Sequence, residues 1–378
     1  MTNIKLGDLC KSCAGQIKVE DGELIDYIDI SSIDNEKRKL IGFQTMPFGE
    51  SPSRARKVVK KGSILVSTVR PNLNAIAVLE NDTPNISVAS TGFCILDCKD
   101  DVDNRFVFNF CKSRKFIDDM VSKATGASYP AVSDKIIRSA LVPNYTYEEQ
   151  CNISKVLDSI SDIIDKREAE LFSLDELIKA RFVERFGDCG NMVSMNDLCL
   201  IITDGTHQPP KFQETGIPFI LVSNLSNNTV TYNTEKYISD ETYNELYKRT
   251  PIEQGDLLLS TVGSYGHPAV VTENIKFLFQ RHIAYLKPRR ELVNSFYLHG
   301  ALLAPDGQRQ IEEKVKGIAQ KTLNLSDIRK IMIPLPKLEE QNAFADFVKQ
   351  VDKSKVAVQK ALDETQLLFD SLMQKYFG

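Results

Sequence analysis

The chain repeats itself once, and this repeat limits what it can fold into. The phrase YEEQ at residues 147–150 returns as LEEQ at 338–341, and Phe186-Gly187 returns at the same spacing as Phe377-Gly378. Upstream, GSILVSTV at 62–69 matches GDLLLSTV at 255–262. Because segments along both halves align in order, the chain is a tandem duplication of a unit of roughly 190 residues, which indicates two copies of one domain and not a solenoid of short units.

Length and composition agree with this division. A chain of 378 residues with 42% hydrophobic residues can fill two or three cores. It has no apolar run long enough for a membrane helix and no signal-peptide pattern at its start, so the expected location is the cytoplasm, with no membrane partner. The formal net charge of −4 means that any binding to nucleic acid must use local basic patches.

The eight cysteines are irregularly spaced and are expected to be free thiols. Cys10, Cys13, Cys94 and Cys98 have roughly the spacing of a four-thiolate zinc site. In the second copy, however, Ile202 stands opposite Cys13, and a cysteine that exchanges with isoleucine behaves as a small hydrophobe. We therefore expect no metal site.

Each copy divides into a mixed head and a helical tail, with heads at 1–145 and 187–337 and tails at 146–186 and 338–378. The heads alternate short β-rich runs with later helical stretches, which predicts an α+β fold with a curved antiparallel sheet. The runs are Ser63–Val69, Ala75–Leu79, Asp256–Val262 and Pro268–Thr272, and the helical stretches are Arg105–Lys123 and Ser295–Lys316. Thr146 and Glu149 form a capping box and Gly187 is a helix stop, so the first tail is predicted to be one helix of about 40 residues, about 60 Å long.

Each tail carries an apolar stripe with heptad spacing. In the first tail the stripe is Ile153, Leu157, Ile160, Ile164, Leu171, Leu174 and Ile178, and in the second it is Phe344, Val348, Val351, Val358, Leu362 and Phe369. A long helix with one apolar stripe cannot bury it alone, so we expect the tails to pair as an antiparallel coiled coil with pseudo-two-fold symmetry. The alternative is that each stripe packs on its own head.

At this point the chain resembles a known family. The order of head, long helix, head and long helix, with PNYTYEEQ and PLPKLEEQ at the helix starts, resembles the DNA specificity subunit of type I restriction-modification enzymes. The phrases STVRPNLNAIAVL, TDGTHQPPKF, GDLLLSTVGSYGHPAVV and QRHIAYLKP resemble phrases of that family's target recognition domains. The first head departs from the pattern, since CAGQIKVE stands where the second head has GTHQPP.

The resemblance implies a reading protein without catalysis of its own. Each head would read one half of a split site in double-stranded DNA, the helices would set the spacing, and two methyltransferase subunits would bind. A motor and nuclease subunit can join. This chain would bind no cofactor, while S-adenosylmethionine, ATP and magnesium would serve the partner subunits.

The sequence motifs also indicate a chain without catalytic activity of its own. The sequence has no P-loop. The Asn/Asp-Pro-Pro-aromatic motif that adenine methyltransferases would require is missing, because Pro209-Pro210 follows Gln208 and precedes Lys211. Methyl transfer is therefore expected from a partner.

Candidate DNA contacts are basic and amide side chains that reach phosphates and base edges. In the first head they are Arg54, Arg56, Lys57, Lys60, Lys61, Arg70, Asn72, Asn74, Ser128 and Tyr129. In the second head they are Thr206, His207, Lys211, Ser264, Tyr265, His267, Gln280 and Arg281. The alternative readings are a solvated charged face for the basic run and metal ligation for the histidines.

Other functions remain open from the sequence. One is a related methyltransferase-only or type IIB-like system, another is a protein-binding scaffold without DNA, and a third is a methyltransferase or nuclease with an unfamiliar site.

Overall fold

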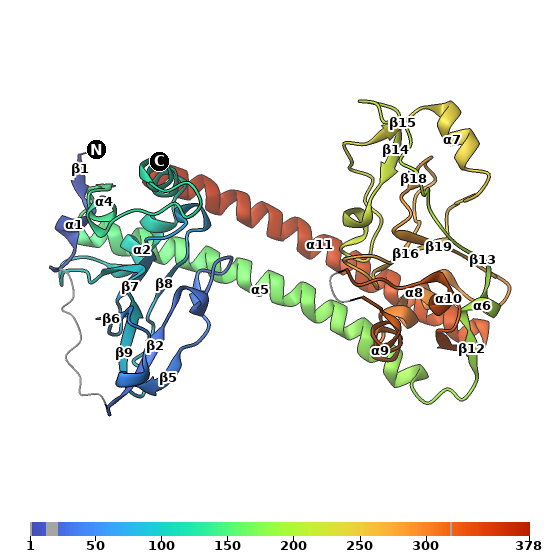
Figure 1. Ribbon diagram of the computed structural model, residues 1–378, viewed down its shortest axis with the longest axis horizontal. Coiled ribbons are helices and arrows are strands. Elements are labelled where there is room, and N and C mark those ends of the chain that lie inside the picture. Colours follow the sequence, from blue (N-terminus) through green and yellow to red (C-terminus); the bar gives the residue numbers. More distant parts are fainter. Residues whose placement is uncertain (1, 13–21, 318–319) are drawn as a thin grey trace. The chain divides into compact units, whose positions relative to one another are not determined.

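The computed structural model describes residues 2–12, 22–317 and 320–378, which form two compact units. Unit 1 comprises Met1–Arg167 with Ala361–Gly378, and unit 2 comprises Glu168–Lys360. Two long helices of 40 residues, α5 (Tyr147–Phe186) and α11 (Leu338–Phe377), contribute segments to both units (Figure 1). Cys13 lies outside the described residues.

The predicted capping box starts the first long helix. The Glu149 backbone N–H donates to Thr146 Oγ1 at 3.3 Å, and the Thr146 N–H donates to Glu149 Oε2 at 2.8 Å. These bonds satisfy two backbone donors at a helix start, where the first turn has no intrahelical acceptors. At the other end the Gly187 N–H donates to the Val183 carbonyl at 2.8 Å. The local signals therefore give α5 the bounds that the sequence predicts.

Unit 1 contains a four-stranded sheet of order β5-β2-β9-β6 and a three-stranded sheet of order β10-β7-β8, with the small pairs β1-β11 and β3-β4. Its strands are β1 (Asn3–Lys5), β2 (Leu24–Ile28), β3 (Ile33–Asp34), β4 (Lys39–Leu40), β5 (Gln44–Pro47), β6 (Ala55–Val58), β7 (Ile64–Ser67), β8 (Ile76–Val78), β9 (Ile86–Ser90), β10 (Phe93–Leu96) and β11 (Leu141–Pro143). Its short helices are α1 (Leu6–Leu9), α2 (Asn104–Lys112), α3 (Arg114–Lys123) and α4 (Asp134–Arg138).

Unit 2 contains a four-stranded sheet of order β13-β19-β16-β17 and a three-stranded sheet of order β15-β14-β18, with the pair β12-β20. Its strands are β12 (Met192–Ser194), β13 (Cys199–Asp204), β14 (Ile217–Ile220), β15 (Tyr237–Ile238), β16 (Leu257–Ser260), β17 (Pro268–Val270), β18 (Leu278–Phe279), β19 (Ile283–Pro288) and β20 (Met332–Pro334). Its short helices are α6 (Met195–Leu198), α7 (Asp240–Leu246), α8 (Ser295–Leu303), α9 (Pro305–Lys314) and α10 (Leu325–Ile328).

The duplication is visible element by element. The order β7, β8, β10, α2, α3, α4, β11 in unit 1 corresponds to β16, β17, β19, α8, α9, α10, β20 in unit 2. The predicted α+β class is confirmed, and β7, β8, β16 and β17 fall within the predicted runs. The sheets are not purely antiparallel, however, because β2 pairs with β9 in parallel and β14 pairs with β18 in parallel. Short strands separated by long connections leave strand direction undetermined by hydrophobic pattern alone.

Each predicted helical stretch of the heads is divided in two. The stretch Arg105–Lys123 becomes α2 and α3, because Ser113 adopts extended backbone and its side chain caps α3 by accepting from the Phe116 N–H. Ser295–Lys316 becomes α8 and α9 at Ala304, which precedes Pro305. A residue before proline is disfavoured in the helical region, so the break follows from the sequence.

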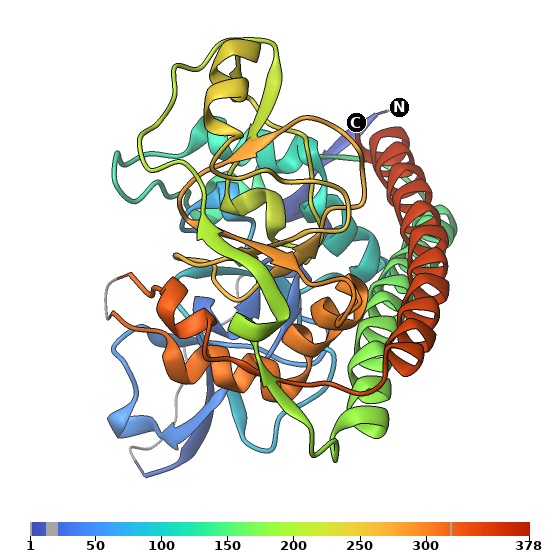
Figure 2. The ribbon, with the colours of Figure 1, turned by 90° about the vertical axis from the view of Figure 1, so that its right-hand side faces the viewer.

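The C-terminal end of each long helix packs on the head of the other copy of the repeat, an arrangement that we call the exchange of helix ends. In unit 1, Met373 and Phe377 of α11 pack with Ile153 and Leu157 of α5 on the core of the first head. In unit 2 the α5 end provides Phe182 and Phe186, which pack with Phe344 and Val348 of α11 on the second head. Within each unit an α5 segment thus lies antiparallel beside an α11 segment (Figures 1 and 2).

The apolar stripes therefore pack both against the partner helix and against the heads. Ile153, Leu157, Ile160, Phe344, Val348, Val351 and Val358 are buried, and the remaining stripe residues are partly buried. The stripe ends near a head pack against that head as well as against the partner helix. Phe182, Phe186, Met373 and Phe377 extend the seam beyond the predicted residues, and the return of Phe186 as Phe377 in the repeat was the available signal.

Cys10 and Cys98 lie opposite each other in an isolated antiparallel bridge, and both are free thiols. Among the described residues no group of three or more His, Cys, Asp or Glu side chains could hold a metal ion. No helix in the described part of the chain has both the length and the apolar character required to cross a bilayer.

Candidate nucleic-acid interface

In unit 2 three chain segments meet at one end of the sheet β13-β19-β16-β17. Strand β13 ends at Asp204 opposite Ala284, and β16 ends at Ser260 opposite Ile283. Because neighbouring strands run antiparallel, the segment after Asp204, the segment before Ile283 and the β16–β17 connection all leave from the same end. We call this the unit 2 sheet end. It contains all the predicted residues of the second head: Thr206, His207, Lys211, Ser264, Tyr265, His267, Gln280 and Arg281.

Backbone hydrogen bonds fasten the first of these segments. The Thr206 N–H donates to the Phe279 carbonyl and the Arg281 N–H to the Thr206 carbonyl, both at 3.1 Å. A Cβ atom at Gly205 would clash with the Phe279 and Gln280 carbonyl oxygens, so only glycine allows this close approach. The GTH phrase is therefore tied directly to the segment that carries Gln280 and Arg281.

The side chains of this segment surround a cavity of about 460 Å³ that Gly205–Lys211 share with α7 and Arg249. His207 Nε2 lies 2.8 Å from Asp204 Oδ2, and Arg249 Nη2 lies 2.6 Å from Asp204 Oδ1. Asp204 therefore holds two potentially cationic groups at the rim of the cavity. The sequence offered no signal for Arg249, because it lies far from the GTHQPP phrase along the chain.

The β16–β17 connection is partly committed to contacts inside the protein. Tyr265 donates a short hydrogen bond to Glu312, whose pKa this bond lowers, and Lys321 Nζ lies 5.6 Å from the Tyr265 ring centroid. His267 Nδ1 lies 3.0 Å from Asn228 Oδ1. Ser264 is exposed. This connection thus exposes Ser264 and leaves Tyr265 partly buried, with Lys321 of a separate segment lying on its ring.

Unit 1 has the corresponding arrangement. Strand β7 ends at Ser67 opposite Phe93, the first residue of β10, and the connection that follows carries Arg70. The Arg70 N–H donates to the Pro130 carbonyl at 2.7 Å, and its guanidinium lies 5.0 Å from the Tyr129 ring centroid. Tyr129 is 68% exposed, which is unusual for so large an apolar surface. Arg70, Asn72, Ser128 and Tyr129 thus gather here, and we call this place the unit 1 sheet end.

The two sheet ends are built alike. Bridges join Val69 to Ala131 in unit 1 and Val262 to Thr322 in unit 2. The turns before them place Gly126 and Gly317 at the same φ of 102°, a conformation that favours glycine. Ile318 and Ala319 of the second turn lie outside the described residues. Gly126 and Gly317, which stand 191 residues apart in the repeat, therefore occupy equivalent places.

One predicted contact is a structural residue. Asn74 is only 6% exposed, has left-handed backbone with φ of 45°, and its amide donates to the Cys111 carbonyl at 3.3 Å. A side chain held in this way cannot present its amide to DNA without breaking a buried hydrogen bond. Asn72, two residues earlier, is exposed.

The basic run at 54–61 is divided between different places in unit 1. Arg54 pairs with Asp29 at 2.7 Å, and its pKa is raised first by the hydrogen bond to Tyr27 and then by Asp29. The guanidinium of Arg56 lies 5.6 Å from the Phe48 ring centroid. Lys57 Nζ donates to the Phe93 carbonyl at 2.6 Å and pairs with Asp134 at 2.7 Å. These three cations are engaged with the protein's own groups.

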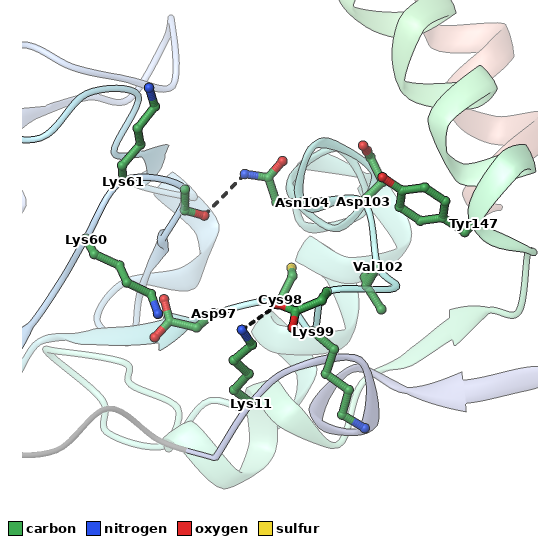
Figure 3. Close-up of a pocket in the computed structure, with 12 residues that line it drawn as sticks. Lys11, Lys60, Lys61, Asp97, Cys98, Lys99, Val102, Asp103, Asn104 and Tyr147 are labelled. Atoms are coloured by element: carbon green, nitrogen blue, oxygen red, sulfur yellow. Dashed lines mark hydrogen bonds and ion pairs between the residues drawn. The ribbon is translucent and has the colours of Figure 1, made fainter.

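Lys60 and Lys61 lie at the opposite end of β7 from Arg70. They line a cavity of about 320 Å³ together with Lys11, Lys99 and Asn104 (Figure 3). Lys11 Nζ pairs with Asp100 Oδ1 at 2.7 Å across this cavity's rim. Lysines from three separate segments thus gather here, beside the carboxylates of Asp97, Asp100 and Asp103. Only Lys60 and Lys61 were predicted, because Lys11 and Lys99 stand alone among neutral or acidic neighbours in the sequence.

Comparisons with known proteins support one family. Residues 191–365 match the type I restriction modification DNA specificity domain. The EcoBI specificity subunit of Escherichia coli is 24% identical over 321 residues, covering 75% of this chain and 67% of its own length. The MjaVIII specificity subunit of Methanocaldococcus jannaschii is 20% identical over 299 residues, covering 69% of this chain and 68% of its own length.

Solved structures share the fold. One solved chain comes from a study of complex assembly and conformational transition of the type I R-M system. It superposes with a TM-score of 0.61 at 23% identity, and the match covers 99% of this chain and 97% of the other. The S subunit of the type I restriction-modification system from M. genitalium gives 0.54 at 14% identity, with 100% and 96% coverage. Residues 191–365 therefore match a type I restriction modification DNA specificity domain, and the chain as a whole is similar to type I specificity subunits in sequence and in fold.

Proposed function

We propose that the chain reads a bipartite site in double-stranded DNA, one half with each head, 1–145 and 187–337, as a non-catalytic subunit. The observation that carries this proposal is the pair of equivalent sheet ends, each of which gathers basic, amide and aromatic side chains from separate segments. Such side chains suit phosphate contacts and base-edge hydrogen bonds. The shared scaffold and different side chains suit two readers of different sequence.

The sheet ends would contact the bases, and the lysines elsewhere in unit 1 would contact the phosphates. At the unit 1 sheet end, exposed Arg70 and Tyr129 provide a planar cation and a stacking surface, and at the unit 2 sheet end Gln280 and Arg281 provide hydrogen-bonding groups. Lys60, Lys61, Lys11 and Lys99 suit contacts to phosphates away from the bases. Since the whole chain has a net charge of −4, these local cations would carry most of the salt dependence.

The long helices would set the half-site spacing and dock two methyltransferase subunits, and a motor and nuclease subunit would complete a restriction enzyme. S-adenosylmethionine, ATP and magnesium would bind to those partners. The complex would act in the cytoplasm. A methyltransferase-only or type IIB-like assembly would use the same reading surface.

The test is to exchange residues 187–337 for the second head of a related specificity subunit and to express the chimera with the methyltransferase partner. Single-molecule sequencing of methylated adenines should show one half-site changed, with the other half-site and the spacing kept. Matched variants Arg70→Ala and Arg281→Ala should each relax one half-site only. Simultaneous change of both half-sites, or unchanged methylation by the chimera, would contradict the model. Absence of any DNA footprint would favour the protein-binding scaffold instead.

A further inference from the structure

Unit 2 contains a cavity of about 230 Å³ that the reading surfaces do not use. It is bounded by α8, the loop at 227–230, and the segments of α5 and α11 that belong to this unit. Much of its wall is apolar, including Phe172, Phe296 and Val348, and Phe172 is 67% exposed. A largely apolar hollow with a few polar groups is the usual form of a small-molecule site.

The wall of this cavity carries three carboxylates, Asp175, Glu176 and Asp352, and two ammonium groups, Lys179 and Lys355. Lys355 Nζ lies 2.6 Å from Asp175 and 4.0 Å from Asp352, so one ammonium serves two carboxylates. The neighbouring pair Lys179 and Glu176, at 2.8 Å, is neutral as a unit. The Asp352 side chain is 48% exposed, and burial of the remainder raises its pKa although Lys355 lies nearby. The cavity therefore has one carboxylate more than its cations satisfy.

His299 adds a second acceptor to the wall. Its Nε2 lies 3.0 Å from the Asn228 carbonyl and 3.1 Å from the Pro268 carbonyl. Carbonyl oxygens only accept, so the proton of the neutral ring must sit on Nε2 and Nδ1 is left with a lone pair. Burial lowers the pKa of His299, which favours this neutral form. His299 lines the cavity, and among the described residues its Nδ1 has no hydrogen-bond partner.

The first copy of the repeat shows what such a place accommodates. Helices α2 and α8 correspond residue by residue, so that Phe108 stands opposite His299 and Lys112 opposite Leu303. In unit 1 the Lys112 ammonium lies 4.8 Å from the Phe108 ring centroid and 5.6 Å from that of Phe369 on α11. Unit 1 thus fills the space between its head helix and the long helices with a lysine side chain, although burial lowers the pKa of its ammonium to about 8. In unit 2 the corresponding Leu303 brings no charge, and the space is a cavity.

We propose that the unit 2 cavity binds a small organic cation, an ammonium group on an apolar stem. The ammonium would donate to Asp352 and to His299 Nδ1, which are acceptors without sufficient donors. The apolar stem would lie against Phe172 and Phe296, whose area favours apolar atoms, while Lys349 Nζ already lies 5.7 Å from the Phe296 ring centroid. The site does not depend on the DNA-reading role.

The test uses the full chain and 2-phenylethylammonium, with 2-phenylethanol as a neutral compound of the same shape. Isothermal titration calorimetry should give saturable binding of the ammonium with a Kd on the order of 1 mM, as suits so few heavy atoms. The alcohol should bind at least about tenfold more weakly, because it brings no charge to the unpaired carboxylate. Equal affinities, or no saturable binding of the ammonium, would overturn the proposal.

Three variants locate the site. Asp352→Asn should weaken binding about tenfold, whereas Asp346→Asn, which changes an exposed carboxylate on the same helix, should not. Leu303→Lys should abolish binding by supplying the ammonium internally, as Lys112 does in unit 1. Equal losses in the two asparagine variants would show non-specific attraction and would also overturn the proposal. The ¹⁵N resonance of His299 Nδ1 in the unaltered chain gives an independent readout, since it should move with the ammonium and not with the alcohol.

Discussion

Phe377 and Phe106, which come from nearly opposite parts of the sequence, lie with their ring centroids 5.3 Å apart in the core of unit 1. Their counterparts in the repeat, Phe186 and Tyr297, lie 5.0 Å apart in unit 2. Each long helix therefore completes the core of the head that belongs to the other copy. The two contacts make the exchange of helix ends testable one unit at a time.

Truncation of either phenylalanine should destabilise one unit selectively. Phe377→Ala should cost about 3–5 kcal/mol in unit 1 and Phe186→Ala a similar amount in unit 2, because each removes a fully buried ring. Hydrogen–deuterium exchange should therefore rise in α2 for the first variant and in α8 for the second. The control Leu367→Ala alters a residue on α11 that is 75% exposed and should change stability by less than about 0.5 kcal/mol. Equal loss of protection in both heads from either variant would rule out separate cores.

Lys57 and Arg70 should behave differently although both belong to the predicted contacts. Lys57→Met removes a hydrogen bond to the Phe93 carbonyl and the pair with Asp134, so it should lower stability by about 1–2 kcal/mol. It should leave the dependence of DNA affinity on salt unchanged. Arg70→Met should instead weaken DNA binding by about 1–3 kcal/mol with little effect on the urea midpoint. A flatter salt dependence for Lys57→Met would mean that this ammonium leaves Asp134 to contact phosphate.

Lys112 should make stability depend on pH above neutrality. Burial lowers the pKa of Lys112 to about 8 from an ordinary value of 10.5. Between these values the unfolded chain binds more protons than the folded one, so the contribution of Lys112 to stability rises with pH. Below about pH 8 its cost is complete, and Lys112→Met should then be more stable than the unaltered chain by about 2–3 kcal/mol. Urea denaturation from pH 7 to 10 should show this advantage shrinking as pH rises.

The matched control for this series is Lys353→Met, which alters an exposed lysine on α11. Its difference from the unaltered chain should be small and constant with pH. An advantage of Lys112→Met that stays constant up to pH 10 would show that packing, and not charge burial, separates the two proteins.

Tyr285 should stabilise unit 2 through a buried carboxylate. Its hydroxyl lies 2.8 Å from Asp256 Oδ2 and 2.9 Å from the Pro251 carbonyl, and both Tyr285 and Asp256 are fully buried. Burial and then this hydrogen bond raise the pKa of Tyr285. Tyr285→Phe should cost about 1–3 kcal/mol, because it leaves Asp256 one donor short. Thermal denaturation beside Tyr237→Phe, a change in the partly buried strand β15, measures the difference.

Periodicity and repetition predicted most of the fold because they are properties of the backbone and of apolar spacing. The heptad stripes and the Thr146–Glu149 box are local signals, and they gave the long helices and their pairing. The direction of β9 beside β2 was not predictable, since a strand pattern carries no information about the strand beside it. Likewise, no local pattern indicates that a helix end packs on the other head.

Residue type and loop position predicted Arg70, Tyr129, Gln280 and Arg281 as DNA contacts, and the structure places these residues where antiparallel strands end together. That they contact DNA stays a prediction. Charge clustering along the chain was a poor guide to clustering in space. Lys57 and Lys60 stand three residues apart, yet one is turned inward to Asp134 while the other lines a cavity with Lys11 and Lys99. Asn74 was predicted to contact DNA because an amide can hydrogen-bond a base edge. The same amide can donate to a buried carbonyl, and here it donates to that of Cys111.

The exchange of helix ends also orders the events of synthesis. The core of unit 1 includes Met373 and Phe377, which the ribosome adds only after all of Glu168–Lys360. At roughly 5–20 residues per second, this interval is about 10–40 s. During that time Phe106 and Phe110 lack their contacts with the Phe377 ring, and the core of unit 1 is incomplete while unit 2 is synthesised. Unit 1 is therefore completed only after all of unit 2 has been synthesised, the reverse of the common order in which the N-terminal domain folds first.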